Sequence, residues 1–182
     1  MKLVIVESPA KCKKIESFLG KDYRCIASYG HICEISNGLK SIDIENNYTP
    51  KFDLMKNKLK NINILRKEIR DASEVIIATD DDREGEAIGW HICNVFNLPV
   101  NVTKRIIFRE ITKNALVDAV QNPTIIDINK VNSQKARMVL DLLVGYLLSP
   151  ILWKQISANK DNKLSAGRCQ TPALKIIYEN QI

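Results

Sequence analysis

Two short runs that are apolar except for Glu74 set the strongest limit on the fold of this 182-residue chain. Leu3–Val6 and Glu74–Ala78 are rich in β-branched residues and do not alternate with polar ones, which predicts strands buried on both faces. Each run is followed by a turn and then by helical spacing, over Ala10–Leu19 and Glu86–Phe96. Strands that alternate with helices in this way predict an α/β fold with a mostly parallel sheet flanked by helices.

The first 130 residues continue this pattern and form the first predicted domain. Ser8 and Pro9 are typical of a helix start, and Gly20 is typical of a helix stop. Residues 36–60 are polar and rich in Asn and Lys, which predicts a long irregular connection. Periodicity predicts two more strands and two more helices, at Tyr23–Tyr29, Arg105–Phe108, Asn61–Ala72 and Lys113–Gln121.

Residues 131–182 form a second predicted domain, which is all-α. Val131–Leu148 has the spacing of one long helix, and Pro150 is expected to interrupt it before a short helical piece at Ile151–Ile156. Residues 157–164 are polar and are expected to be flexible. Thr171–Tyr178 predicts a further helix with a proline in its first turn. Because the sequence then stops without a helix-stop residue, we expect it to be a truncated fragment.

Composition narrows the class of protein. The net charge is +6, and residues 131–182 carry seven basic against three acidic side chains, which is compatible with a nucleic-acid partner. The chain has five cysteines, an odd number, and none of them forms a Cys-x-x-Cys pair, so we expect no zinc site. Free thiols are typical of a reducing compartment. We find no signal peptide and no uninterrupted apolar stretch of membrane-spanning length. The expectation is therefore an intracellular, soluble protein that does not bind a membrane.

The segment Thr79–Glu86 (TDDDREGE) is the main candidate for chemistry, because it follows a buried strand. Ligands of open α/β sheets bind at this edge. In an extended chain Asp80, Asp82 and Glu84 would point to one side, where three carboxylates repel one another unless a cation neutralises them. Oxygen ligands of this kind suit Mg²⁺.

An ordinary alternative is that Asp81 and Glu84 form a capping box at the start of a helix. Glu7 bears on the choice, because it ends the other buried run. If the two strands are parallel neighbours, Glu7 lies at the same edge as Asp80. A single Glu after a strand is more often simply solvated, so this step depends on the pairing.

Several segments resemble, in order, the type IA DNA topoisomerases. Val4–Lys11 (VIVESPAK) is similar to the opening of these enzymes, and Thr79–His91 (TDDDREGEAIGWH) is similar to their Toprim acidic motif. Four further segments are similar to the part that follows it and to the start of the helical domain that grips single-stranded DNA: Phe108–Thr112, Ala136–Asp141, Val144–Pro150 and Leu164–Leu174. The continuation after the acidic motif resembles the bacterial topoisomerase I branch.

This resemblance implies a mechanism. Such enzymes cut one DNA strand through a 5′-phosphotyrosine link, pass another strand and reseal the break, which relaxes negatively supercoiled DNA without ATP. By position, Mg²⁺ would be held by Glu7, Asp80, Asp82 and Glu84. Glu7 would also be the general acid for the departing 3′ oxygen, and Lys11 and Arg137 would stabilise the phosphate. Without the motif, Lys11 would be interpreted as a solvated lysine.

The resemblance also implies a set of DNA contacts to a single-stranded segment, made by a monomer that needs no nucleotide cofactor. Asp141 would place a base, and the full set is His31, Arg83, Arg137, Asp141, Lys154, Ser165, Ala166, Gly167, Arg168, Cys169 and Gln170. The chain departs from the family at Cys33, where Arg is common, at Cys169, where Val is usual, and in an insert at residues 159–163. Cys33 removes one expected basic contact.

The five tyrosines of the chain stand in other contexts than the motif of the attacking tyrosine. We therefore expect that the chain does not cleave DNA by itself. Two other interpretations remain open at this point: a stand-alone Toprim nuclease or primase-like protein, and a binding module without chemistry. The segment 131–174 separates the topoisomerase interpretation from these, because only a topoisomerase has a reason to contain it.

Overall fold

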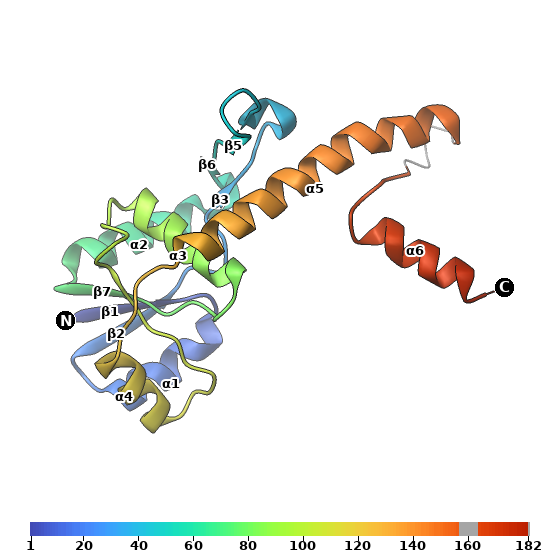
Figure 1. Ribbon diagram of the computed structural model, residues 1–182. Coiled ribbons are helices and arrows are strands. Elements are labelled where there is room, and N and C mark those ends of the chain that lie inside the picture. Colours follow the sequence, from blue (N-terminus) through green and yellow to red (C-terminus); the bar gives the residue numbers. More distant parts are fainter. Residues whose placement is uncertain (157–163, 182) are drawn as a thin grey trace. The chain divides into compact units, whose positions relative to one another are not determined.

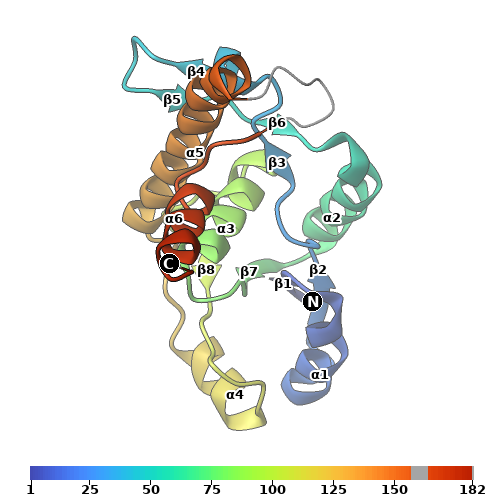
Figure 2. The same cartoon turned by 90° about the vertical axis from the view of Figure 1, so that its right-hand side faces the viewer.

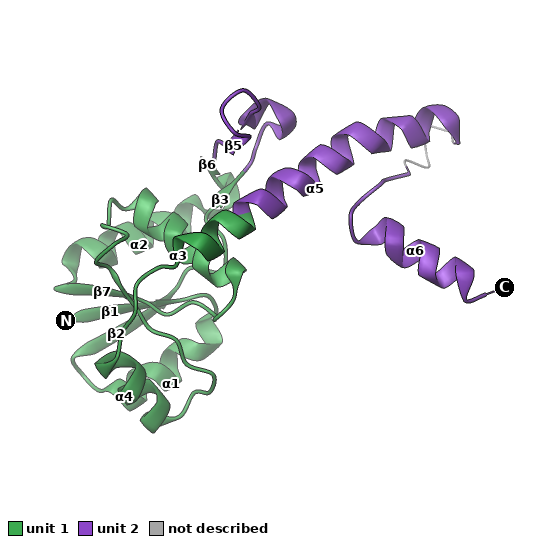
Figure 3. Ribbon diagram, in the orientation of Figure 1, with its two compact units in different colours: residues 1–34, 53–134 green, residues 35–52, 135–182 purple. Residues whose placement is uncertain are grey.

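The computed structural model describes residues 1–156 and 164–181, and it divides the chain into two compact units. Unit 1 comprises Met1–Glu34 and Asp53–Gln134, and unit 2 comprises Ile35–Phe52 and Lys135–Ile182 (Figure 3). The insert expected at residues 159–163 lies outside the described residues. The domain boundary after residue 130 stays a prediction.

Unit 1 is built on a four-stranded parallel sheet with the order β2-β1-β7-β8. Its strands are β1 (Lys2–Val6), β2 (Tyr23–Ala27), β7 (Glu74–Ile77) and β8 (Lys104–Arg105). Leu3, Val4, Ile5 and Val6 of β1 are all buried rather than alternately buried and exposed, since helices cover both faces of the sheet. The α/β fold with a parallel sheet is thereby confirmed.

Four helices flank this sheet. Helices α1 (Pro9–Leu19) and α4 (Lys113–Gln121) lie on one face, and α2 (Leu59–Asp71) and α3 (Arg83–Val95) lie on the other (Figures 1 and 2). The first face packs Val4 and Val6 against Ile15 of α1 and Leu116 of α4 in one hydrophobic cluster. The predicted bounds of α1 and α4 are confirmed, since Gly20 ends α1 at a φ of 85° and Thr112 caps α4.

Three expectations for unit 1 and its neighbouring segment need correction. Residues 36–60 are not wholly irregular: besides the start of α2, they contain the elements η1 (Gly38–Ser41), β4 (Ile42–Asp43), β5 (Thr49–Pro50), β6 (Asp53–Leu54) and η2 (Lys56–Lys58), while β3 (Cys33–Glu34) pairs with β6. The last strand stops at Arg105 rather than Phe108, because β7 offers it only Ile76 and Ile77 as partners. Helix α3 begins at Arg83, three residues before the predicted start.

Unit 2 contains the β4–β5 hairpin, most of the long helix α5 (Ile128–Gln155) and α6 (Gln170–Glu179). Gly38 of η1, at a φ of 54°, packs so tightly on Tyr146 of α5 that a Cβ would lie 2.5 Å from the phenol oxygen. This contact joins the segment 35–52 to α5. Helix α6 ends at Glu179 with Asn180 as its C-cap, so the expectation that the sequence has no helix-stop residue after this helix is wrong.

Pro150 does not interrupt α5, contrary to the prediction. The helix continues to Gln155, and the Ile156 N–H donates to the Leu152 carbonyl oxygen at 2.9 Å. Pro150 has no N–H to donate to the carbonyl of Tyr146, four residues earlier, and its ring crowds that carbonyl. Tyr146 and Pro150 are both exposed, so water can donate a hydrogen bond to the Tyr146 carbonyl oxygen in place of the missing N–H.

Helix α5 is also the one helix, among the described residues, that is long and apolar enough to cross a membrane by length and composition. Its best 18-residue window has a mean hydropathy of 1.5. The sequence prediction considered only uninterrupted apolar runs, whereas this window is allowed up to two charged residues. One such helix is weak evidence for a membrane span.

Candidate functional site

The carboxyl ends of β1 and β7 bring the first two candidate residues together. The strands pair in parallel with Ile5 opposite Ile77, and the chain continues from them to Glu7 and Asp80. Oε1 of Glu7 accepts a hydrogen bond from the backbone N–H of Asp80 at 2.8 Å. The prediction that Glu7 lies beside Asp80 depended on the two strands being parallel neighbours, and they are.

Lys11 joins this pair from α1. Its Nζ lies 2.5 Å from Oδ1 of Asp80, in an ion pair whose side chains are 27% and 54% exposed. The helix starts two residues after Glu7, so one turn of α1 is enough to carry Lys11 back over the sheet edge. A cationic group therefore already neutralises the carboxylate that was expected to hold a metal ion.

Asp82 has a structural role that the sequence assigned to another residue. It is the N-cap of α3, and its Oδ1 accepts from the backbone N–H of Gly85 at 2.7 Å. The alternative of a capping box formed by Asp81 and Glu84 is not what the structure has, because the N-cap of α3 is Asp82. Asp81 instead forms an ion pair with Lys130 at 2.9 Å, and this hydrogen bond lowers the pKa of the Asp81 carboxyl group.

Gly85 lets the backbone of α3 approach the acidic turn. A Cβ at this position would lie 2.1 Å from the carbonyl oxygen of Asp80, closer than any real side chain allows. The same turn is tied down by Thr79, whose Oγ1 donates to the Gly85 carbonyl oxygen at 2.7 Å. The glycine is therefore needed for close approach rather than for an unusual φ.

Glu84 points to a different set of partners. Its Oε2 lies 3.2 Å from Nε2 of His31 and accepts a hydrogen bond from Nε2 of Gln134. The His31 ring lies edge-on to that of His91, with centroids 6.2 Å apart. The sequence argument placed Asp80, Asp82 and Glu84 on one side of an extended chain; since α3 starts at Arg83, Glu84 is turned by the helix instead.

The four expected metal ligands are thus close in the chain but not gathered into one ligand set. Among residues 1–156 and 164–181, no group of three His, Cys, Asp or Glu side chains is placed to hold a metal ion. Glu7 and Asp80 are adjacent at the sheet edge, Asp82 caps a helix, and Glu84 contacts His31. Two carboxylates remain as a donor set, which fits Mg²⁺, an ion that keeps several waters and uses one or two protein carboxylates.

Arg105 was not singled out from the sequence, yet it organises the acidic turn. Its side chain is 0% exposed, and its Nε lies 2.9 Å from Oε1 of Glu86, which is 2% exposed. Nη1 donates to the Thr79 carbonyl oxygen at 2.9 Å, and Nη2 donates to the Asp80 carbonyl oxygen at 2.9 Å. The Glu86 carboxylate also accepts from the backbone N–H of Asp127 at 3.2 Å. One buried cation therefore fixes the backbone that carries Asp80.

Unit 2 gathers three of the expected DNA-contacting residues. Nε of Arg168 lies 2.7 Å from Oδ1 of Asp141, and Nε of Arg137 lies 3.7 Å from Oδ2 of the same carboxylate. The hydrogen bond from Arg168 is the main reason that the pKa of Asp141 is lowered. The two guanidinium groups share one carboxylate, so the cluster keeps a net positive charge.

The segment that follows residue 163 is held by polar contacts within unit 2. The backbone N–H of Ala166 donates to Oγ of Ser149 at 3.1 Å, and Nε2 of Gln170 donates to Oγ of Ser165 at 3.0 Å. Gly167 and the exposed Cys169 complete the turn into α6. Two other expected DNA contacts are exposed on helices, Arg83 at the start of α3 and Lys154 in the last turn of α5.

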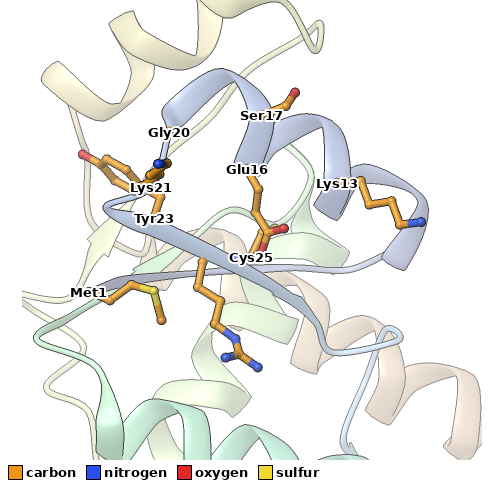
Figure 4. A pocket seen from close by; sticks show the side chains of 9 residues that line it. Met1, Lys13, Glu16, Ser17, Gly20, Lys21, Tyr23 and Cys25 are labelled. Atoms are coloured by element: carbon orange, nitrogen blue, oxygen red, sulfur yellow. Dashed lines mark hydrogen bonds between the residues drawn. The ribbon is translucent and has the colours of Figure 1, made fainter.

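A separate hollow of about 800 Å³ lies between α1 and β2 (Figure 4). It is lined by Met1, by residues of α1 and β2, among them Lys13 and Glu16, and by Lys21 of the turn between these two elements. Glu16 points into it and accepts from the backbone N–H of Cys25 at 2.8 Å. None of the residues expected to act on metal or DNA lines this hollow.

Comparisons with known proteins show which family the chain resembles. The family described as Toprim domain matches residues 2–111, and the family described as DNA topoisomerase matches residues 125–182. Among solved structures, full-length topoisomerase I from Thermotoga maritima is similar, with a TM-score of 0.84 and 44% sequence identity. The match covers 96% of this chain and 29% of that chain, so this chain spans less than a third of its relative.

Proposed function

Since the chain belongs to the type IA DNA topoisomerases, with a Toprim domain at residues 2–111, we propose that it supplies the cation-binding and part of the DNA-binding machinery of such an enzyme. The enzyme would relax negatively supercoiled DNA by Mg²⁺-dependent cleavage and religation of one strand. The attacking tyrosine, which would form the 5′-phosphotyrosine link, is expected outside this sequence. The meeting of Glu7, Asp80 and Lys11 at one sheet edge carries this proposal.

Mg²⁺ would be held mainly by Asp80 and Glu7 in this proposal. A divalent ion bound there would supply positive charge for the phosphate at the reacting centre. Because Lys11 occupies Oδ1 of Asp80 in the structure, a cation must share that carboxylate with the ammonium group or displace it. Ligation by Asp82 and Glu84 stays a prediction, since each has another partner.

The other residues would act on DNA directly. Lys11 would stabilise the charge on the scissile phosphate, and Glu7 would protonate the departing 3′ oxygen. In unit 2, Arg137 and Arg168 would contact phosphates, with Asp141 near an incoming base. His31 and the segment Ser165–Gln170 would add contacts to the single strand. The phosphate contacts would give most of the affinity and make it depend on salt.

The metal proposal is tested by calorimetric titration of the chain with Mg²⁺. Asp80→Asn removes the charge of the proposed ligand and is expected to weaken binding at least about tenfold. Asp81→Asn is the matched control, because this neighbouring carboxylate is paired with Lys130 and is not a proposed ligand. Lys11→Gln removes the competing cation, so it is expected to bind Mg²⁺ more tightly than the unchanged chain. Equal affinities of the Asp80→Asn and Asp81→Asn variants would overturn the assignment.

The cleavage proposal is tested with end-labelled single-stranded DNA and Mg²⁺. By itself the chain is expected to bind the DNA, to leave it intact and to form no covalent adduct. A chain that nicks the strand catalytically without an adduct would instead be a Toprim nuclease, and the topoisomerase mechanism would then be wrong for it. Relaxation activity is to be measured on the full-length protein, where Glu7→Gln is expected to abolish it.

A further inference from the structure

Tyr29 adopts a backbone conformation that is unusual for a large side chain. Its φ is 60°, and that of Gly30, which follows it, is 84°. A bulky residue in the left-handed region is an outlier, and such outliers gather at ligand-binding sites, where the surroundings hold them in place. The residue is nevertheless 56% exposed, so burial of its ring does not account for the strained conformation.

The backbone around Tyr29 is held firmly from α2 and the segment before it. Nδ2 of Asn61 donates to the Ser28 carbonyl oxygen at 2.9 Å, and Nζ of Lys58 donates to the carbonyl oxygen of Tyr29. The backbone N–H of Met55 donates to the Ile32 carbonyl oxygen at 3.0 Å. In the part of the chain that the structure describes, the Tyr29 phenol itself makes no hydrogen bond or ring contact. The fixed backbone thus presents a free aromatic ring to solvent.

The turn that contains Tyr29 follows β2 at the same edge of the sheet as the candidate site. Ala27 pairs with Val6, and the backbone N–H of Ser28 donates to the Val6 carbonyl oxygen at 2.8 Å, so Ser28 follows β2 beside Glu7. On the other side of Tyr29, His31 contacts Glu84. The turn that contains Tyr29 therefore lies between Glu7 and His31, two residues of the candidate site.

Tyr48 offers a comparison within the same chain. It also has a positive φ, 55°, and is 49% exposed. With Asn47 it forms the central pair of a turn in the loop that joins the paired strands β4 and β5; the Thr49 N–H closes this turn by donating to the Asn46 carbonyl oxygen at 3.1 Å, and a type I′ turn has positive φ values at both central residues. β2 and β3 are not paired with each other, so no hairpin explains the conformation of Tyr29.

We propose that Tyr29 is a stacking platform for one unpaired base of the DNA strand that enters this site. Single-stranded DNA is bound by aromatic rings that stack on bases, next to cations that track the phosphates. Lys58 is such a cation, because its ammonium group has three donors and the Tyr29 carbonyl oxygen uses one. This inference rests on the proposed function, and it adds a residue that distinguishes an unstacked base from a paired one.

The test measures binding of a labelled single-stranded oligonucleotide of about 12 nucleotides, within usual site sizes. Tyr29→Phe keeps the ring and is expected to bind within about twofold of the unchanged chain. Tyr29→Leu and Tyr29→Gly are expected to lose about fivefold or more, the usual loss for one stacked base. Glycine accepts a positive φ without strain, so Tyr29→Gly is expected to show an undiminished melting temperature despite its weaker binding.

Salt dependence separates stacking from charge. None of the Tyr29 variants loses a phosphate contact, so the slope of log affinity against log salt is expected to stay unchanged between about 50 and 200 mM. Lys11→Gln is the contrasting variant, with a shallower slope. Unchanged affinity in Tyr29→Leu and Tyr29→Gly would overturn the inference, and so would a loss in Tyr29→Phe as large as that in Tyr29→Leu. A chain that binds no oligonucleotide at all would instead overturn the proposed function, and this inference with it.

Discussion

The buried pair of Arg105 and Glu86 leads to the sharpest prediction about stability. The two side chains are 0% and 2% exposed, and their charged atoms lie 2.9 Å apart. Removing one partner leaves the other charge buried and uncompensated, which costs about 3–5 kcal/mol. Since a domain is stable by only about 5–15 kcal/mol, either Arg105→Met or Glu86→Leu is expected to remove a large share of the stability of unit 1.

A double-mutant cycle predicts the sign of the interaction energy between Arg105 and Glu86. Because Arg105→Met with Glu86→Leu leaves no uncompensated charge, the double variant is expected to be more stable than the sum of the single losses, by about 2 kcal/mol or more. It does not recover fully, because the carbonyl groups of Thr79 and Asp80 lose their donors. Conservative replacement by Arg105→Lys keeps a charge but loses the planar guanidinium group that reaches both carbonyls.

Urea unfolding followed by tryptophan fluorescence measures this cycle. Trp90 lies on α3 and reports on unit 1, and Trp153→Phe removes the second tryptophan, which lies in unit 2. Single losses that add up in the double variant to within about 0.5 kcal/mol would refute the reasoning, because they would mean that the two charges do not interact. If Arg105 also positions the acidic turn, the double variant regains stability without regaining Mg²⁺ affinity.

Two further predictions concern single residues. Gly85→Ala places a methyl group 2.1 Å from the Asp80 carbonyl oxygen and is expected to cost more than about 3 kcal/mol in urea unfolding, whereas Gly89→Ala most closely meets the movable side chain of Ile77, at 3.0 Å, and is expected to cost less. Asp141 is expected to titrate below the ordinary aspartate pKa of 3.8 in a carboxyl-carbon NMR titration, and Arg168→Ala is expected to raise its pKa toward that value. Because the pKa of Asp141 is lowered in the folded state, the stabilisation it gives is present above pH 3.8 and is lost as the pH falls through the lowered value.

The sheet edge was predictable from the sequence because it follows from strand direction alone. Two buried runs in parallel must end at the same edge, and this places Glu7 next to Asp80 whatever the details of packing. Helix α4 was predictable to the residue, because Thr112 supplies a local cap and the hydrophobic spacing is regular. In both cases the information lies within a few neighbouring residues.

The remaining features depend on contacts between distant parts of the chain. Nothing near Arg105 in the sequence indicates that its charge is buried, because Glu86 lies nineteen positions earlier and the two meet only in the folded sheet. The start of α3 was missed by three residues because the prediction began the helix where its apolar spacing begins, whereas Asp82 caps the helix earlier by accepting a hydrogen bond from the Gly85 N–H. Because of this earlier start, Asp80, Asp82 and Glu84 do not follow the alternation of an extended chain, and each has a different partner in the structure. Likewise, no sequence pattern predicts the positive φ of Tyr29.

The ion pair between Lys11 and Asp80 implies that the metal and DNA sites are coupled. In the structure the ammonium group of Lys11 is engaged by the carboxylate proposed to hold Mg²⁺. An ion that takes over Asp80 frees Lys11 for a phosphate, so Mg²⁺ is expected to increase the affinity for single-stranded DNA.

Linkage then requires that DNA increase the affinity for Mg²⁺ by the same factor, which for coupled sites is typically about 5- to 150-fold. Titrations of each ligand in the presence and absence of the other measure both factors. Lys11→Gln has no ammonium group to release, so the two factors are expected to fall toward one in this variant. Coupling that persists undiminished in Lys11→Gln would show that the exchange at Asp80 is not its cause.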